Sequence, residues 1–171
     1  VSTNASWGID NGDPDDVPLW NAVYDSLGVY GVLNCGATAN NNVNIDIVGD
    51  IPTALPSDYM ISVTATNNSD VRTFSGYGAT TIDLGAPGAS VWTTQPNNGY
   101  GSTSGTSFAS PLTAGAIALI YSTPCPSFMA LVHGDPQSGA DYVRQMLFEG
   151  TDPIANLETE CVTGGRLNVN N

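Results

Sequence analysis

The chain has 171 residues, the length of a single domain, and 41% of them are apolar, which is enough for a buried core. Its 16 acidic residues outnumber three arginines, there is no lysine, and the net charge of −13 argues against nucleic acid or an anionic membrane as a partner. No segment approaches the roughly 20 consecutive apolar residues of a membrane-spanning helix.

The first part of the chain predicts strands on either side of a helix. Strand patterns lie at about 1–7, 29–38 and 59–65. Residues 17–28 predict a helix because their apolar side chains share one helical face: Val17, Trp20, Val23, Tyr24 and Leu27. The stretch 41–58 is long and irregular, which is typical of a loop.

The second part of the chain continues the alternation of strands and helices. A fourth strand pattern covers 82–85, and 88–100 predicts a hairpin whose turn is Pro96-Asn97-Asn98-Gly99. Helices are predicted at 106–122 and 138–149, the second with Val143, Met146 and Leu147 facing inward. This alternation predicts an α/β fold of three layers, a parallel sheet covered by helices on both faces.

The sequence G-T-S-F-A-S-P at 105–111 makes Ser107 a candidate nucleophile. A serine hydroxyl attacks a carbonyl only when it lies at an exposed turn, beside a base, with donors aimed at the oxyanion. Here Ser107 opens a helix, so that its N–H and the helix N-terminus face the developing charge. For this motif alone, a polar loop that caps a buried helix is the better interpretation. The esterase pattern G-x-S-x-G fails because residue 109 is Ala109.

The segment resembles the nucleophile motif of the subtilisin-like serine proteases (subtilases), G-T-S-x-A-x-P-x-x-x-G, which here ends at Gly115. Five further segments resemble family motifs in family order: N-A-S-W-G at 4–8, V-L-N-C-G-A-T-A-N at 32–40, F-S-G-Y-G at 74–78, D-L-G-A-P-G at 83–88 and G-G-R-L-N-V at 164–169. The resemblance covers nearly the whole chain. Leu112-Thr113 replace the family's frequent His-Val, a change that concerns helix packing rather than chemistry.

The resemblance assigns roles to individual residues. Ser107 would be the nucleophile, and Asn40 the side-chain donor to the oxyanion. Asparagine is also common in turns at strand ends, and Asn41 and Asn42 leave the assignment open by one residue. Substrate contacts are implied for the other motif residues: Ser6, Trp7, Gly8, Ala37, Thr38, Ala39 and Thr106.

The resemblance also concerns the specificity pocket. Ala39 replaces the family's usual glycine, which narrows the approach to the pocket, and the loop 41–58 is expected to line it. Subtilases often have a cis peptide bond before a proline that soon follows this strand, so we expect a cis bond between Ile51 and Pro52. Only about 5–6% of X-Pro bonds in folded proteins are cis.

Subtilase triads follow the order Asp, His, Ser along the chain. The Asp and His segments are expected before Ser6, where this chain has five residues, and its one histidine, His133, is interpreted as a surface loop residue. Residues 1–171 are therefore interpreted as the C-terminal part of one subtilase-like catalytic domain that lacks the N-terminal strands. It would supply the nucleophile, oxyanion hole and part of the specificity pocket of a secreted endopeptidase, and be inactive alone. The alternative is an inactive fragment that binds peptide or a partner.

Partners and ligands follow from the same interpretation. We expect a polypeptide substrate, and pairing of the apolar edge at 1–7 with the N-terminal half of the domain or with a second copy. No cofactor is required. Four aspartates after Gly8 are interpreted as a solvated acidic rim of the cleft, with a structural calcium site as the alternative: Asp10, Asp13, Asp15 and Asp16.

The three cysteines are expected to behave differently. A disulfide between Cys125 and Cys161 is favoured for a secreted protein and would close a loop of roughly 36 residues, worth roughly 4 kcal/mol. Cys35 lies on an apolar strand and is expected to be a buried free thiol.

Overall fold

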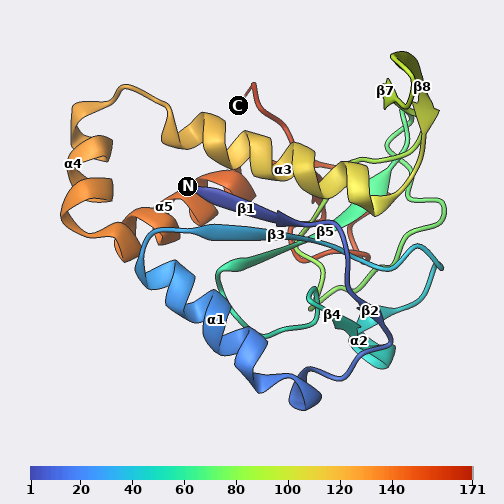
Figure 1. The fold of residues 1–171 in the computed structure, drawn as a ribbon, viewed down its shortest axis with the longest axis horizontal. Coiled ribbons are helices and arrows are strands. Elements are labelled where there is room, and N and C mark those ends of the chain that lie inside the picture. The colour runs from blue at the N-terminus through green and yellow to red at the C-terminus, as the bar shows by residue number, and fades with distance from the viewer. Residues whose placement is uncertain (171) are drawn as a thin grey trace.

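A computed structural model describes residues 1–170 and shows a parallel sheet between helices (Figure 1). Its elements in chain order are β1 (Ser2–Ala5), β2 (Ile9–Asp10), η1 (Pro14–Asp16), α1 (Pro18–Val29), β3 (Leu33–Ala37), α2 (Ile45–Val48), β4 (Asp50–Ile51), β5 (Met60–Thr66), β6 (Leu84–Pro87), β7 (Val91–Gln95), β8 (Gly99–Thr103), α3 (Thr106–Tyr121), α4 (Pro126–Gly134), α5 (Pro136–Glu149), β9 (Asp152–Pro153) and β10 (Gly165–Arg166).

The main sheet has six strands in the order β1-β3-β5-β6-β10-β9. All neighbours pair in parallel except β9, which is antiparallel to β10. Every residue of β5 is buried, as expected for a parallel strand covered on both faces. The predicted α/β class is confirmed, and β1 forms one edge of this sheet.

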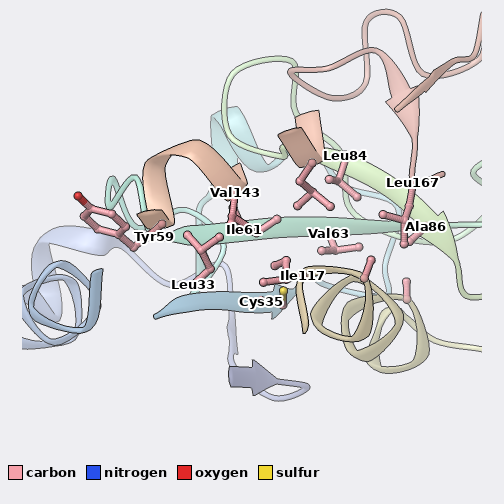
Figure 2. Packing of buried hydrophobic residues seen from close by; sticks show 14 of the residues in the cluster. Leu33, Cys35, Tyr59, Ile61, Val63, Leu84, Ala86, Ile117, Val143 and Leu167 are labelled. Carbon is pink, nitrogen blue, oxygen red and sulfur yellow. The ribbon is translucent and has the colours of Figure 1, made fainter. Parts of the chain in front are cut away.

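The helix α3 lies along one face of the sheet and closes the main core. Leu33, Cys35, Ile61 and Val63 come from alternate positions of β3 and β5, so they point to the same face, and all are fully buried. Ile117 of α3 packs against them, and Figure 2 shows α5 joining the same cluster through Val143. The start of α3 is thereby held against the carboxyl ends of the strands.

The opposite face of β5 is polar and is covered largely by loops, with α1 on that side in Figure 1. Ser62 Oγ donates to the carbonyl oxygen of Thr53 at 2.7 Å, and Thr64 Oγ1 and Ser75 Oγ lie 2.7 Å apart. These buried hydroxyls bind the segment after β3, through Thr53, and the segment after β5, through Ser75, to the sheet. A second, smaller apolar cluster fills the rest of this layer: Ala39, Ile45, Ile82, Leu157 and Cys161.

The predicted helices agree with α1, α3 and α5 to within two residues, but one inward-facing assignment is wrong, and one residue of the predicted apolar face of α1 is exposed. The side chain of Val23 on α1 is 56% exposed, and that of Met146 on α5 is 41% exposed. Each helix buries a narrower stripe than its apolar pattern indicates, because only one side contacts the rest of the chain.

Seven short or unexpected elements were not predicted: β2, η1, α2, β4, α4, β9 and β10. The expected loop 41–58 contains the short α2 and β4, and α4 follows α3 directly in a region that prolines at 124 and 126 mark as a turn. Pro126 is the first residue of α4, where its missing N–H costs nothing. His133 is therefore an exposed residue in the last turn of a helix rather than in a loop.

All three cysteines are free thiols, so the predicted disulfide is wrong. Cys125 stands at the start of α4 and packs against the main core, whereas Cys161 is buried in the smaller cluster. Leu157 of that smaller cluster lies against Gly85, on the face of β6 away from α3, so the two thiols belong to different layers. Cys35 is a buried free thiol, as predicted.

No single helix within residues 1–170 is long and apolar enough to cross a membrane. Only α3 and α4 taken together, with a bend of 108° between them, reach that length and composition.

Two valines on different helices test this assignment of the core. Val143→Ala removes methyl groups from a fully buried site and should lower the free energy of unfolding by roughly 2–3 kcal/mol. Val23→Ala changes an exposed helical position and should be neutral or stabilising by a few tenths of a kcal/mol. Urea unfolding of both variants gives the comparison, and equal losses would contradict the packing of α1 and α5.

Candidate active site

Ser107 is the second residue of α3, and its neighbour Thr106 joins that helix to the end of β3. Thr106 Oγ1 donates to the carbonyl oxygen of Thr38 at 2.5 Å. Thr106 is 1% exposed, so this bond lies inside the protein, away from bulk water. The nucleophile candidate is thus placed at the carboxyl edge of the sheet, at the N-terminus of a 16-residue helix.

Pro111 determines which group donates a hydrogen bond to the carbonyl oxygen of Ser107. A proline has no N–H, so the carbonyl oxygen of Ser107 lacks its usual helical donor four residues later. The Ser6 hydroxyl donates to that oxygen at 3.0 Å, and Ser107 Oγ donates to the carbonyl oxygen of Ser6 at 3.3 Å. Asn4 Nδ2 in turn donates to Ser6 Oγ at 2.9 Å. The segment after β1 is therefore fixed directly beside the candidate nucleophile.

Asn40 faces the start of the same helix. Its Oδ1 accepts from Thr106 N at 3.0 Å, and Thr106 Oγ1 lies 3.2 Å away. Because a backbone N–H can only donate, the amide must present oxygen to the helix, which turns its donor, Nδ2, to the other side. Asn42 instead binds Arg72 through its Oδ1 at 2.5 Å. Of the asparagines at 40–42, Asn40 is the one beside Ser107 and Thr106.

One cavity of about 170 Å³ brings the site residues together. Its lining contains all nine residues that the sequence suggested for the site, one aspartate of the predicted acidic rim and one residue that the sequence did not suggest: Ser6, Trp7, Gly8, Ala37, Thr38, Ala39, Asn40, Thr106 and Ser107, together with Asp10 of the rim and Asp50. The nucleophile candidate and the candidate oxyanion donor thus open onto the same space.

Part of the cavity wall depends on a close approach at Gly8. A Cβ on Gly8 would lie 1.8 Å from the carbonyl oxygen of Ile51, so no other residue fits. Beyond that contact β2 pairs with β4 in antiparallel fashion, with Asp10 opposite Asp50. The Ile51-Pro52 peptide bond is cis, as predicted.

The sequence model of the subtilase family matches residues 3–145. The chain belongs to the subtilase family. Subtilisin E of Bacillus subtilis (strain 168) is 32% identical over 141 residues, which are 81% of this chain and 36% of that protein. Subtilisin-like protease 2 of Plasmodium falciparum (isolate 3D7) is 32% identical over 120 residues, 70% of this chain and 9% of that protein. This subtilase chain thus spans about a third or less of the length of these relatives.

Solved structures show the same fold at lower identity. A lanthipeptide protease superposes with a TM-score of 0.79 at 21% identity, covering 98% of this chain and 60% of that one. A structure of the subtilase cytotoxin SubAB gives a TM-score of 0.76 at 21% identity, covering 98% of this chain and 56% of that one. The arrangement of sheet and helices is therefore the subtilase arrangement.

The histidine of this subtilase chain lies away from Ser107. His133 is in the last turn of α4, and α4 follows the far end of α3 in Figure 1. With 16 residues, α3 is roughly 24 Å long. Ser107 thus has a carbonyl oxygen of this chain, not an imidazole, as its hydrogen-bond partner.

The aspartates of the predicted acidic rim do not share one environment. Asp10 lines the cavity, whereas Asp13 caps the short helix η1 by accepting from Asp15 N at 2.9 Å. Within residues 1–170, no group of three or more histidine, cysteine or acidic side chains is arranged to hold a metal ion. The calcium alternative stays a prediction.

Asp50 is the site residue that the sequence did not reveal. It is 2% exposed and accepts a hydrogen bond from the Thr53 hydroxyl. Burial raises the pKa of its carboxyl to about 6; the hydrogen bond from Thr53 and the nearby Thr38 hydroxyl and Ala39 N–H oppose the shift, and the charge of Asp10 adds to it. The one available signal was an acidic residue directly before the Ile-Pro of a loop expected to line the pocket.

This pKa shift makes stability depend on pH. Because the folded pKa of Asp50 lies above the ordinary value of 3.8, the native state binds the extra proton between about pH 4 and 6. The stability that Asp50 contributes is present below pH 4 and is lost as the pH rises through 6. Relative to the wild type, Asp50→Asn should therefore gain up to about 3 kcal/mol between pH 4 and 7. Urea unfolding at both pH values measures this gain, and a pH-independent difference would contradict the shift.

Proposed function

We propose that this chain is the C-terminal part of a serine endopeptidase catalytic domain. It would supply the nucleophile Ser107, the oxyanion donors and part of the specificity pocket for the substrate residue before the cleaved bond. The proposal rests on one observation above all: Ser107, Asn40 and Thr106 line the same cavity as the segment 6–8. We also propose that the enzyme acts outside the cell, as its subtilase membership and acidic surface favour.

The chemistry would follow from the groups already described. Ser107 Oγ attacks the carbonyl carbon of the substrate and gives its proton to a base, and the former carbonyl oxygen becomes negative. The N–H of Ser107 and Nδ2 of Asn40 would donate to this oxyanion, and the positive end of α3 adds to the stabilisation. The tetrahedral intermediate then collapses as its C–N bond breaks, and the base returns the proton to the departing amine, which is the first product. Water, deprotonated by the same base, attacks the acyl-enzyme and releases the carboxylic acid product and free Ser107.

The base and its carboxylate would come from a part of the protein outside these 171 residues. Two features support a covering element beside α3. The outer edge of β1 lies free of strands in the part of the chain that the structure describes. The exposed side of α3 is apolar or small throughout: Pro111, Leu112, Gly115, Ala118 and Leu119.

Gly115 is the clearest sign of such a cover. A Cβ at this position would meet no atom of the described chain within 4 Å. A glycine inside a helix costs about 1 kcal/mol relative to alanine, so a gain elsewhere must offset it. A close approach by the N-terminal part of the same domain, or by a second copy of this chain, would provide that gain. The shares of subtilisin E and of the lanthipeptide protease that this chain covers favour the N-terminal part.

A second candidate function is peptide binding without hydrolysis. It is favoured by the hydrogen bond from Ser107 Oγ to Ser6, which leaves the hydroxyl without a base inside this chain. A fluorophosphonate probe separates the two functions, because it labels only an activated serine.

The chain alone should show no peptidase activity, whereas the chain combined with the N-terminal part should cleave a chromogenic peptide and label with a fluorophosphonate. Ser107→Ala should abolish both signals. Asn40→Ala should lower kcat about 10²–10³-fold, the loss known for such a donor in subtilisin, a member of the family. Exposed Asn41 serves as the control, and Asn41→Ala should leave kcat unchanged. Turnover by the chain alone that Ser107→Ala removes would show that the base lies within it.

Gly115→Leu tests the covered face of α3. Leucine favours the helix by roughly 1 kcal/mol over glycine and meets open space, so the isolated chain should become more stable. The same side chain should block assembly with the N-terminal part, measured by sedimentation and by recovered activity. Ala130→Leu places a leucine on exposed α4 and should leave assembly intact. Normal assembly of the Gly115→Leu variant would show that this face is not closely covered.

A further inference from the structure

Two carboxylates stand in the wall of the cavity beside Ser107. Asp10 and Asp50 stand directly opposite each other in the β2–β4 pair, and both line the cavity. Residues opposite in an antiparallel pair project on the same side of the ribbon, roughly 5 Å apart at Cβ. Two like charges in this position destabilise the pair unless something compensates them.

Within residues 1–170, no lysine or arginine side chain pairs with these two carboxylates. The sequence has no lysine, and its three arginines are engaged elsewhere. Arg72 pairs with Glu160 at 2.6 Å, Arg144 lies 3.7 Å from Asp58, and Arg166 pairs with Asp152 at 2.7 Å. The carboxylates at the cavity therefore face a space that the chain's own positive groups do not reach.

Leaving the charged carboxylate unpaired costs more free energy at Asp50 than at Asp10, because Asp50 is buried. At 2% exposure, its charged form loses most of its hydration, and the Thr53 hydroxyl replaces only part of it. The hydroxyl of Thr38 in the same wall is buried as well and makes no hydrogen bond of normal geometry, although it is near enough to lower the pKa of Asp50. A cationic ligand that entered the cavity would find a buried carboxylate and a free hydroxyl oxygen together.

We infer that this cavity takes a lysine or arginine side chain of the substrate, and that Asp50 determines this specificity. The ammonium or guanidinium would pair with the Asp50 carboxylate, with the exposed Asp10 adding attraction at the cavity. Since Ser107 and Asn40 line the same space, the side chain belongs to the residue whose carbonyl is attacked. This inference rests on the proposed function for its catalytic part, but not for the binding of the cation.

An apolar side chain is the less favourable occupant. It would remove the remaining water from Asp50 without replacing the lost hydrogen bonds, whereas an ionised partner forms a charge-assisted bond in a poorly hydrated place. Binding of a basic side chain would thus relieve the repulsion between Asp10 and Asp50.

The first test uses binding to the chain itself, so that its result does not depend on catalysis. Amide chemical shifts of Ala39 and Asn40 are followed by NMR during titration with n-pentylammonium and, separately, with 1-pentanol. The cation should bind at least about 10-fold more tightly than the alcohol, and Asp50→Asn should remove that advantage. Asp16→Asn, an exposed change on η1, is the control and should retain it. Equal binding of the two compounds, or displacement of the amine by micromolar Ca²⁺, would overturn the inference.

The second test uses the chain combined with the N-terminal part. Values of kcat/KM are compared for peptides that differ only in the residue before the cleaved bond, Lys, Arg, Gln or Leu. Lys and Arg should exceed Gln and Leu by at least about 10-fold, and Asp50→Asn should cut the ratio about 10- to 100-fold while cleavage at Leu persists. Asp10→Asn should act in the same direction by a smaller factor. A preference for Leu, or a Lys-to-Leu ratio unchanged in both variants, would refute the assignment. Selective binding without any turnover would refute the proposed function alone.

Discussion

A proline inside α3 frees the carbonyl oxygen of Ser107 from its helical donor, and the hydroxyl of Ser6 takes the vacant place at 3.0 Å. Ser2 and Asn4 extend this connection, because residues two apart on a strand face the same side. Ser2 Oγ donates to the carbonyl oxygen of Ala114 at 2.9 Å, and Ser110 Oγ donates to Asn4 Oδ1 at 2.6 Å. The outermost strand is thus held on α3 by hydroxyl and amide groups rather than by apolar packing, and the segment 6–8 keeps its place beside the nucleophile.

The hydrogen bonds that stabilise the start of α3 also orient the side chain of the candidate oxyanion donor. The Thr106 N–H and hydroxyl at the start of α3 fix the orientation of Asn40, so the amide donor is directed before any substrate is present. Stabilisation by donors that are already oriented avoids a cost of reorganisation during the reaction. The polar face of β5 plays a comparable part, since the hydrogen bond from Ser62 to Thr53 anchors the segment that carries Asp50.

The sequence was sufficient for the features that depend on local pattern or on motif order. Ser107, Asn40 and the segment 6–8 could be placed at one site because each belongs to a motif, and the buried strands β3 and β5 are long enough to show their period. The two-residue strands β2 and β4 have no period, and they form only where Gly8 lets two chain segments approach. Asp50 was missed for this reason. The wrong disulfide has a similar cause, since no pattern tells which layer a cysteine occupies.

Because all three arginines are engaged in ion pairs, the charge of the chain affects how fast a polypeptide reaches the protein as well as how tightly it binds. A chain of net charge −13 whose positive groups are already paired presents an almost uniformly negative field to an approaching polypeptide. Such a field speeds the diffusion of basic segments toward the surface and slows that of acidic ones. The Debye length shrinks from about 30 Å at 0.01 M salt to about 10 Å at 0.1 M, so this kinetic selection weakens as ionic strength rises. Salt would then alter which segments arrive at the cavity, while the buried carboxylate inside it is screened far less.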